Sequence, residues 1–476
     1  MQKPLLEAAA NTDFVLPLPL DARLHREALA RFVLALDQVA DADILFADED
    51  VLRRGERAQP WFKTDWDEYF MLGKNCVGVP AIYRSEAVLR MRTQPAQSTT
   101  VDNFLYALAL QVSLTTSHER IHHIPAVLCH RTAPPDWDRA QAAEAVREHL
   151  AQRGWDVTQI GPAPLAPQYN QIRFSLPTPA PMVSIIVPTK DRAELIGPCI
   201  EGLLQRTDYP SLELIIVDND TTAADALDVL EAAQKDARVL VLHDDRAFNF
   251  SRLNNEAAKH AHGEILLLLN NDTKVIHSDW LTEMASLASR PDVGVVGARL
   301  LYPDLRVQHA GVCFGDSPGP YHKMRLAARH EAGPAGELAL LRRSWAVTGA
   351  CLALRKSLYF EVGGLDEEAF AVAFNDIDLC LKIAEKGLAV LCTPYAELLH
   401  FESVSRGAPT TPQQAEREAG ELRAFWSKHN ALYETPDPYY NPQVDQREGY
   451  VDFARPPRLN RFRPSFERQT LSTPTY

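Results

Sequence analysis

The chain lacks the cysteine patterns that mark disulfide-bonded and zinc-binding proteins. Its seven cysteines are odd in number and scattered, and no two of them form a C-x-x-C pair. Small secreted folds pair an even set of cysteines, and zinc ribbons use closely spaced pairs. The sequence therefore predicts reduced thiols and excludes a disulfide framework or a zinc ribbon.

Positive charge and long hydrophobic runs are also scarce. The formal net charge is −14 and the isoelectric point is about 5.6, whereas a nucleic-acid surface needs clustered lysine and arginine. No apolar run approaches the roughly 18–20 residues of a membrane span, and the N-terminal "MQKPLLEAAANTDF" lacks the apolar core of a signal peptide. These absences exclude a nucleic-acid partner and predict a cytoplasmic protein.

The composition is that of a globular protein, interrupted by one proline-rich stretch. The 476 residues are 46% hydrophobic and 24% charged, which suits roughly two to four folded domains. Residues 161–181, "GPAPLAPQYNQIRFSLPTPAP", carry proline too densely for a helix or a central strand. We expect an extended connection here and place the main domain boundary in it.

Downstream of that stretch, short apolar runs alternate with helical patterns. The runs are "VSIIVPT" (183–189), "LELIIVDND" (212–220), "RVLVLH" (238–243) and "EILLLLN" (264–270). Such runs are typical of strands buried on both faces, and apolar stripes within 195–204 and 279–289 indicate helices. The alternation predicts an α/β domain with a mostly parallel sheet, which binds ligands at the carboxyl ends of its strands.

Polar clusters follow these strands where a ligand would bind. They are "PTKDR" (188–192), "VDND" (217–220), "NND" (270–272) and, at a later helix, "FNDIDLC" (374–380). Asp218 could contact a nucleobase or cap the next helix. The "NND" cluster suits a hydrated divalent cation that also takes phosphate oxygens, or an Asx turn. Asp376 is a candidate general base, or with Asn375 and Asp378 it only stabilises the start of a helix.

Six motifs in order resemble those of glycosyltransferase family 2, over roughly residues 181–407. They are "VSIIVPTKDR", "ELIIVDND", "FNFSRLNNEAAKHAHGEILLLLNNDT", "VTGACLALRK", "GGLDEEAFAVAFNDIDLCLKIAEKG" and "AELLHFESVSRG". The resemblance implies a Rossmann-like GT-A fold with flanking helices and inversion at the anomeric carbon. It also implies a UDP-, dTDP- or GDP-linked sugar donor and Mn²⁺ or Mg²⁺. Within the family, the chain is similar to bacterial O-antigen and rhamnosyltransferase-type enzymes.

The resemblance implies roles for individual residues. Asp376 matches the catalytic base, and Asp272 matches the last acid of the D-x-D motif. Asn270 stands where that motif usually has its first Asp, so His400 is expected to act as a supporting metal ligand; taken alone, it would be a core or capping histidine. The residues expected to bind the nucleotide-sugar are Pro188, Thr189, Asp191, Asp218, Asn219, Asn255, Asn270, Asn271 and Gly349.

The region before the boundary carries a second resemblance. Residues 41–84 and "IHHIPAVLCHR" (121–131) look like the carboxyl-terminal half of another family 2 domain. However, "FVLPLPLDARLHREAL" (14–29) stands in place of the D-x-D-type cluster, and "VDNFLYALAL" (101–110) in place of the acidic helix opening. We therefore expect a truncated, inactive relative of the catalytic domain.

This expectation assigns Asp48, Glu49 and Asp50 to structural or surface roles. The expected division of the chain is 1–160 degenerate glycosyltransferase-like domain, 161–181 linker, 182–410 catalytic domain, and 411–476 helical extension with an Arg-rich tail. The tail "RPPRLNRFRPSFER" (455–468) holds five Arg and two Phe, which suits either anionic lipid headgroups or solvent.

These features predict an inverting glycosyltransferase of cell-surface polysaccharide assembly. The expected partners are a nucleotide-sugar donor and a glycan or lipid-linked oligosaccharide acceptor, with peripheral contact to the inner membrane face as one option. A nucleotidyltransferase is one rival, although "VPTKDRAEL" lacks the glycine-rich loop that such enzymes usually place after the first strand. A catalytically silent scaffold or glycan-binding subunit is the other.

Overall fold

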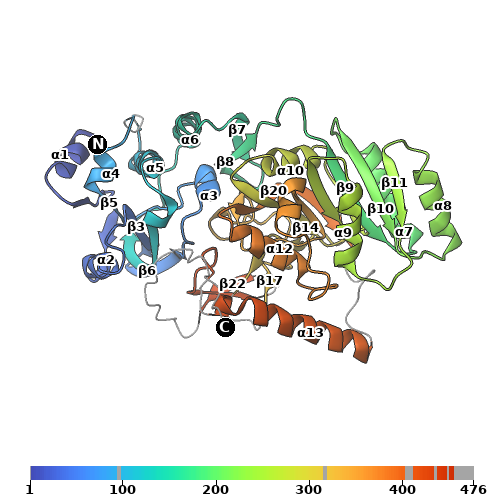
Figure 1. The fold of residues 1–476 in the computed structure, drawn as a ribbon. Coiled ribbons are helices and arrows are strands. Elements are labelled where there is room, and N and C mark those ends of the chain that lie inside the picture. Colours follow the sequence, from blue (N-terminus) through green and yellow to red (C-terminus); the bar gives the residue numbers. More distant parts are fainter. Residues whose placement is uncertain are drawn as a thin grey trace.

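The protein consists of two α/β units that lie side by side, with a long helix, α13 (Pro412–Lys428), along one flank (Figure 1). The structure is a computed structural model and describes residues 2–93, 98–314, 319–401, 411–433, 437–447 and 450–454. We call residues 2–153 the N-terminal unit and residues 183–401 the second unit. The Arg-rich tail lies outside the described residues. Within the described part of the chain, no helix is long and apolar enough to cross a membrane.

The second unit begins with the four strands that the sequence predicts. They are β9 (Val183–Thr189), β10 (Leu212–Asp218), β11 (Val239–His243) and β12 (Ile265–Leu269). All are parallel, in the order β11-β10-β9-β12. In β12, Leu267 and Leu269 pack into the core on one face of the sheet, and Leu266 and Leu268 pack into the core on the other. Burial on both faces explains the continuous apolar run.

Helices connect these strands and cover both faces of the sheet. They are α7 (Ala193–Gln205), α8 (Ala224–Ala233), α9 (Phe250–His260) and α10 (Trp280–Ala288). Residues of α7 and α10 belong to the first core, whereas residues of α9 belong to the second. The predicted α/β architecture is confirmed.

The second half of this sheet is mixed rather than parallel. It contains β13 (Thr273–Val275), β14 (Val293–Leu301), β19 (Cys351–Arg355) and β20 (Ala389–His400), with the edge strands β15 (Val307–His309) and β18 (Arg342–Arg343). The order is β12-β19-β14-β20-β13, and only β14 and β20 run parallel to each other. The prediction of a mostly parallel sheet therefore holds for the first half alone. Apolar runs report burial and not strand direction.

The N-terminal unit has a smaller sheet of six strands. They are β1 (Phe14–Val15), β2 (Ala22–Leu24), β3 (Ile44–Arg53), β4 (Glu56–Trp61), β5 (Ala81–Arg84) and β6 (Ile121–Arg131). The strand order is β1-β5-β3-β6-β2, with β4 paired to β3. The helices are α1 (Gln2–Ala9), α2 (Ala28–Leu36), α3 (Glu68–Gly73), α4 (Ser85–Leu89), α5 (Val101–Ser113) and α6 (Arg139–Arg153).

The N-terminal sheet repeats the topology of the second half of the larger sheet. The order β1-β5-β3-β6-β2 corresponds to β12-β19-β14-β20-β13, and every neighbouring pair has the same direction: only β3/β6 and β14/β20 are parallel. The helices also correspond along the chain. α2 follows β2 as α10 follows β13, and α5 precedes β6 as α12 (Asn375–Ala384) precedes β20. This topology is the one that a truncated relative of the second unit requires. That origin stays a prediction.

The proline-rich stretch is not a simple connection. β7 (Val157–Ala163) and β8 (Ala166–Phe174) form an antiparallel hairpin that takes up two thirds of residues 161–181. Pro164 lies in its turn, between Ala163 and Ala166, where the ladder needs no N–H donor. The guanidinium of Arg173 reaches Asp279 of the second unit at 2.8 Å. The extended connection expected here is therefore limited to the residues between Phe174 and β9.

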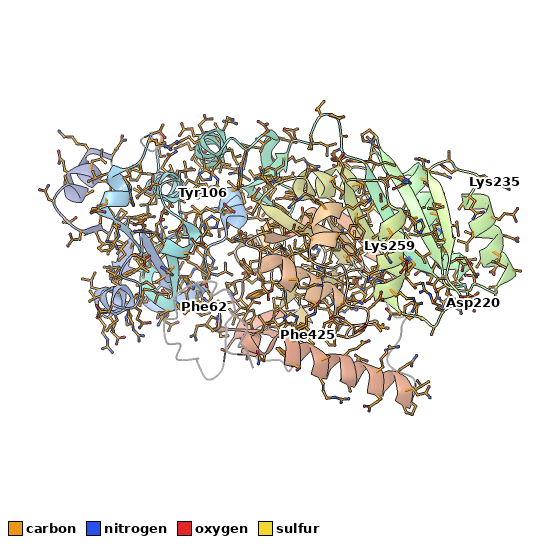
Figure 2. The ribbon with its side chains drawn as sticks, in the orientation of Figure 1. Phe62, Tyr106, Asp220, Lys235, Lys259 and Phe425 are labelled. Atoms are coloured by element: carbon orange, nitrogen blue, oxygen red, sulfur yellow. The ribbon has the colours of Figure 1, made fainter. Side chains whose placement is uncertain are left out.

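Helix α13, within the helical extension that the sequence predicts, packs on the second unit. The ring of Phe425 is fully buried and stacks on Phe374 at 5.3 Å between centroids (Figure 2). The carboxylate of Glu421 accepts hydrogen bonds from the backbone N–H groups of Val372 and Ala373. These contacts fix the loop that leads into α12. Beyond α13, β21 (Val444–Arg447) and β22 (Tyr450–Phe453) form a short hairpin.

Candidate active site

The carboxyl ends of β9 and β10 bring Thr189 and Asp218 together as register neighbours. Asp218 is buried, and its Oδ1 accepts a hydrogen bond from the backbone N–H of Thr221 at 2.9 Å. Its Oδ2 lies 3.2 Å from Nδ1 of His243 at the end of β11. The carboxylate therefore organises the loop after β10 and does not cap α8. Pro188, within β9, is buried beside Val217.

Asp191 links the loops that follow β9 and β10. Its Oδ1 accepts hydrogen bonds from the backbone N–H groups of Thr222 and Ala223, both at 2.8 Å. These two bonds lower the pKa of Asp191 below its usual value. Its own N–H donates to the hydroxyl of Thr221 at 3.1 Å. Asp191 thus holds together the loops that follow β9 and β10, next to Thr189 and Asp218.

The "NND" cluster at the end of β12 forms hydrogen bonds to the end of β9 and to the segment before β19. The side-chain amide of Asn271 donates to Oγ1 of Thr189 at 2.9 Å. The backbone N–H of Asn270 donates to the carbonyl of Ala350 at 3.1 Å. Asp272 is buried directly before β13. The cluster therefore joins the predicted nucleotide edge to the segment around Gly349.

His400, the last residue of β20, faces Asp272. Its Nε2 lies 3.1 Å from Oδ1 of Asp272 and 3.2 Å from Nδ2 of Asn270. Its Nδ1 lies 2.6 Å from Oε1 of Gln308. The amide oxygen can only accept, so His400 donates from Nδ1, and in a neutral imidazole the lone pair is then on Nε2, which faces Asp272. Gln308 was not identified from the sequence, because nothing in "RVQHAGV" marks it.

These two side chains fit a divalent cation. A carboxylate oxygen and an imidazole nitrogen point at each other across 3.1 Å, and both atom types are ordinary ligands of Mn²⁺ and Mg²⁺ sites. Within the described ranges, no three His, Cys, Asp or Glu side chains gather into a metal-binding group. A cation held here would thus have Asp272 and His400 as its ligands of these four types, with other positions for amide, water or phosphate oxygens.

Asp376 is held at the N-terminal end of α12 by two backbone donors. Its Oδ2 accepts from the N–H of Gly349 at 2.7 Å, and its Oδ1 accepts from the N–H of Ile377 at 2.8 Å. A Cβ on residue 349 would lie 3.3 Å from Cβ of Asp376, so the close approach favours glycine. Because Ala350 bonds Asn270, the adjacent residues Gly349 and Ala350 connect the candidate base to the candidate cation site.

Asp378, two residues further along α12, has a structural environment. It is fully buried, and Oδ1 lies 2.8 Å from both Nε2 of His429 and Nζ of Lys428. Although burial opposes the charge, these hydrogen bonds lower the pKa of Asp378. Asn375 donates its side-chain amide to the carbonyl of Val372. Both residues therefore stabilise the helix opening, and Asp376 alone carries the candidate chemistry.

Two residues predicted to bind the nucleotide, Asn255 and Asn219, use their side-chain amides in hydrogen bonds within the protein. The carboxamide of Asn255 bonds the hydroxyl of Tyr359, both backbone polar groups of Leu365 and the carboxylate of Glu367. The side-chain nitrogen of Asn219 donates to the carbonyls of Asp244 and Arg246 at 2.8 and 2.9 Å. Both amides fasten loops to the sheet, a tertiary role that single-sequence matching does not report.

The N-terminal unit holds an ion pair at the place of Asp272 and His400. Asp21 directly precedes β2 as Asp272 precedes β13. Arg131 ends β6 and pairs with the first residue of β2, as His400 ends β20 and pairs with the first residue of β13. The Arg131 guanidinium donates from Nε to Oδ2 of Asp21 at 3.1 Å. A fixed cation thus replaces the histidine.

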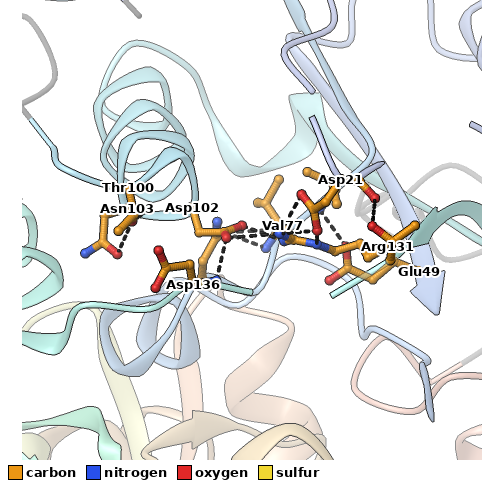
Figure 3. A network of polar contacts seen from close by, with 12 residues as sticks. Asp21, Glu49, Val77, Thr100, Asp102, Asn103, Arg131 and Asp136 are labelled. Atoms are coloured by element: carbon orange, nitrogen blue, oxygen red, sulfur yellow. Dashed lines mark hydrogen bonds and ion pairs between the residues drawn. The ribbon is translucent and has the colours of Figure 1, made fainter. Parts of the chain in front are cut away.

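The same guanidinium also reaches the counterpart of the candidate base (Figure 3). Asp102 is the second residue of α5, as Asp376 is the second residue of α12. Nη1 and Nη2 of Arg131 donate to Oδ1 and Oδ2 of Asp102 at 2.5 and 3.0 Å. Asp21 and Asp102 therefore share one guanidinium. The absence of catalysis in this unit stays a prediction.

The acidic triple on β3 is buried, so the surface role considered for it is wrong. Oδ1 of Asp48 bonds Nε2 of His123 at 2.7 Å and, despite the opposing effect of burial, raises the pKa of His123 to about 9. Asp50 bonds Nδ1 of His130 at 2.5 Å. These two residues are structural. Glu49 accepts only the backbone N–H of Val79, at 3.2 Å, among the described residues.

Comparisons with known proteins agree with the second unit's features. Residues 184–347 match the family model described as Glycosyl transferase family 2. The chain is 37% identical to the uncharacterized protein y4gI of Sinorhizobium fredii over 91% of this chain and 49% of the relative. It is 36% identical to O-antigen biosynthesis protein RfbC of Myxococcus xanthus over 92% of this chain and 34% of the relative. The chain thus spans about half and about a third of these relatives' lengths.

A similar solved structure is mannosyltransferase PcManGT from Pyrobaculum calidifontis in complex with GDP-Man and Mn²⁺. It shares 20% identity and a TM-score of 0.38 over 55% of this chain and 68% of that chain.

Proposed function

Because residues 184–347 are a glycosyl transferase family 2 domain of GT-A type, we propose that this chain transfers a sugar from a nucleotide-diphospho-sugar to a glycan or lipid-linked acceptor. The reaction is an inverting displacement, and the pathway is the assembly of a cell-surface polysaccharide. Similarity to an O-antigen biosynthesis protein supports the pathway. The observation that carries the proposal is the connection of Asp376 to the Asp272–His400 pair through Gly349 and Ala350.

Asp376 acts as the general base in this proposal. Its carboxylate takes the proton of the acceptor hydroxyl while that oxygen attacks the anomeric carbon. The bond from this carbon to the diphosphate oxygen breaks as the new bond forms, so one displacement gives one inversion. The N–H groups of Gly349 and Ile377 hold the carboxylate in one orientation, which lowers the entropic cost of reaching the reactive geometry.

The donor would lie along the edge formed by β9, β10 and β12. Thr189 and Asp218 stand at the ends of adjacent parallel strands, where nucleotides bind in open α/β sheets. Asp191 holds the two loops at this edge. Asn271, bonded to Thr189, lies between the nucleotide end and the diphosphate end of the proposed donor site.

Asp272 and His400 would hold the divalent cation beside the diphosphate. The cation supplies positive charge that stabilises the nucleoside diphosphate as it leaves. The protein fixes the ligand geometry, because Gln308 orients His400 through Nδ1. We propose Mn²⁺ or Mg²⁺, and a donor linked to UDP, dTDP or GDP. A lipid-linked acceptor would bring the chain to the inner membrane face.

The test is a donor screen combined with nucleotide titrations. UDP, GDP and dTDP are titrated calorimetrically with and without Mn²⁺, and release of nucleoside diphosphate is followed from a panel of nucleotide-sugars with cell-envelope lipid extract. We expect one nucleotide to bind in a Mn²⁺-dependent manner and its sugar conjugate to be consumed. A catalytically silent scaffold would show neither, and a nucleotidyltransferase would release pyrophosphate from a nucleoside triphosphate.

A further inference from the structure

A cavity of about 550 Å³ lies outside the candidate active site. It is lined by residues of β3, β4, β6 and β8, by Lys74 after α3, by a loop of the second unit and by the segment after α13. None of the predicted site residues lines it. Six aromatic rings do: Trp61, Phe62, Tyr169, Tyr439, Tyr440 and Phe453. Its volume is within the roughly 300–1,000 Å³ typical of small-ligand sites.

Two residues of the cavity wall, Arg131 and Glu49, belong to the polar network of the N-terminal unit that Figure 3 shows. Arg131, at the position that His400 has in the second unit, lines it together with Glu49 and Asp50. Because the two sheets share one topology, the cavity lies on the side of the N-terminal sheet that corresponds to the active-site side of the larger sheet. The N-terminal unit therefore has a cavity at the position that corresponds to the candidate active site of the second unit.

Lys74 is the unusual member of the cavity wall. Its residue is only 6% exposed, and Nζ lies 3.7 Å from the ring centroid of Trp61 and 4.9 Å from that of Tyr169. Within the part of the chain that the structure describes, this ammonium makes no hydrogen bond and no ion pair. Burial lowers the pKa of Lys74 to about 8. Glu49 and Glu337 act on this ammonium only through their charges, so its N–H groups can donate to a ligand in the cavity.

Glu49 supplies the complementary acceptor. It is 5% exposed, and burial raises its pKa above the usual value. The charges of Lys63, Arg131 and, more weakly, Lys74 lower that pKa. Glu49 and Lys74 form no ion pair within 4.0 Å. The other charges of the wall are already paired: Asp50 with Arg57, Arg131 with Asp102, and Lys323 with Glu337. The cavity thus presents an ammonium without a hydrogen bond among the described residues and a carboxylate that accepts only the N–H of Val79, beside aromatic rings.

Neutral saccharides have the chemistry that matches this wall. A sugar hydroxyl both donates and accepts, so neighbouring hydroxyls can satisfy Glu49 and Lys74 together, while the C–H face of the ring packs on Trp61. A charged ligand would be attracted to one of Glu49 and Lys74 and repelled by the other. Neutral hydroxyls can bond to both.

We propose that this cavity is a saccharide-binding site of the N-terminal unit, which holds a neutral sugar segment of the acceptor glycan on Trp61, Glu49 and Lys74. The identification of the ligand as acceptor glycan rests on the proposed function, whereas the saccharide site itself does not. The N-terminal unit then contributes acceptor binding without catalysis.

The experiment measures sugar binding by the full chain without donor or added cation. The probes are the methyl glycosides of rhamnose, mannose, galactose, glucose and N-acetylglucosamine with their disaccharides, and the readouts are saturation-transfer difference NMR and calorimetry. We expect at least one probe to bind. Trp61→Ala should abolish its binding, and Glu49→Gln and Lys74→Met should each weaken it by about tenfold or more.

Matched variants separate binding from folding. Lys259→Met removes an exposed ammonium on α9 of the second unit (Figure 2) and should leave sugar affinity unchanged. Trp61→Phe keeps an aromatic face and should retain part of the affinity. The proposal is overturned if no probe binds, if a folded Trp61→Ala protein binds sugar as the wild type does, or if methyl glucuronide or inorganic phosphate binds more tightly than every neutral probe.

Nucleotide titrations on the same samples keep the two proposals apart. Sugar binding that is lost in Trp61→Ala, without Mn²⁺-dependent nucleotide binding in the wild type, would contradict the proposed function and leave the saccharide site in place. Nucleotide binding without sugar binding would contradict the saccharide site alone.

Discussion

Arg131 and His400 occupy the same register position in two sheets of the same topology. Each is the last residue of the strand that runs parallel to the central strand, and each pairs with the first residue of the short edge strand. Each also faces an aspartate directly before that edge strand, Asp21 or Asp272. An arginine stays charged at all relevant pH values and has no lone pair for a metal, whereas a neutral histidine does. One residue thus separates a closed ion network from a candidate cation site.

Replacement of Arg131 by Met should destabilise the chain by about 3 kcal/mol or more, because it leaves Asp102 and Asp21 without their shared cation in a largely buried place. The measurement is urea unfolding followed by circular dichroism. Arg423→Met, which removes an exposed partner of Glu416, is the matched control and should change stability by less than about 1 kcal/mol. Equal effects of the two substitutions would contradict a structural role for the network.

Replacement of Asp376 by Asn should lower kcat by about a thousandfold, within the range expected for loss of a general base. The amide is similar in shape and can still accept one of the two backbone hydrogen bonds at this position, so the fold and Mn²⁺-dependent nucleotide affinity should persist. Turnover and calorimetry on the same sample check both statements. Turnover that survives the substitution would assign the base to another residue.

The contrasting substitution is Asp378→Asn on the same helix. Asp378 is fully buried and bonded to His429 and Lys428. Here we expect a lower unfolding midpoint, with kcat per folded molecule close to that of the wild type. The pair of variants therefore distinguishes the chemistry of α12 from its attachment to α13.

The sequence predicts the strands of the second unit well because their signal is local. β9 and β12 are buried throughout, so each reads as an uninterrupted apolar run ending in polar residues. Asp272 and Asp376 follow from the same local reading combined with a family resemblance. The direction of β14 and β19, in contrast, depends on partners far along the chain, and no residue pattern reports it.

The sequence does not predict those residue roles that depend on strand register or on hydrogen bonds between residues far apart in the chain. Asn255 matches a family position, yet its amide is used to fasten the loop before Glu367. Gln308 orients His400 across 92 residues of sequence. Asp21 stands in a stretch of leucine and proline that does not resemble a metal motif, and only the pairing of β2 with β6 places it opposite Arg131.

Replacement of Gln308 by Leu should weaken Mn²⁺ binding in the presence of nucleoside diphosphate by about 10- to 100-fold, because the imidazole of His400 loses the acceptor that fixes its Nδ1 proton. Calorimetric titration of Mn²⁺ into protein saturated with the preferred nucleotide gives this value. Gln308→Glu retains an acceptor and should preserve most of the affinity. Identical affinity in the Leu and wild-type proteins would exclude His400 as an oriented ligand.

Glu283 on α10 should make stability fall as pH rises. Its side chain is buried, its Oε1 accepts from the hydroxyl of Thr393 at 2.8 Å, and burial raises its pKa to about 7. In the unfolded chain the carboxyl titrates near pH 4.5. Between these values the folded state holds a proton that the unfolded state has released, so its favourable contribution is complete below about pH 4.5 and is lost as pH rises through about 7.

Glu283→Gln tests this contribution, because the amide keeps the acceptor oxygen but cannot ionise. The difference in unfolding free energy, variant minus wild type, should be small at about pH 5 and should grow in favour of the variant, by on the order of 2–3 kcal/mol, at about pH 8. Urea unfolding of both proteins across this interval measures the difference, and other titrating groups cancel in it. A difference that does not change with pH would show that the carboxyl is ionised in the folded protein throughout, and that the bond from Thr393, rather than the burial of α10, determines its protonation state.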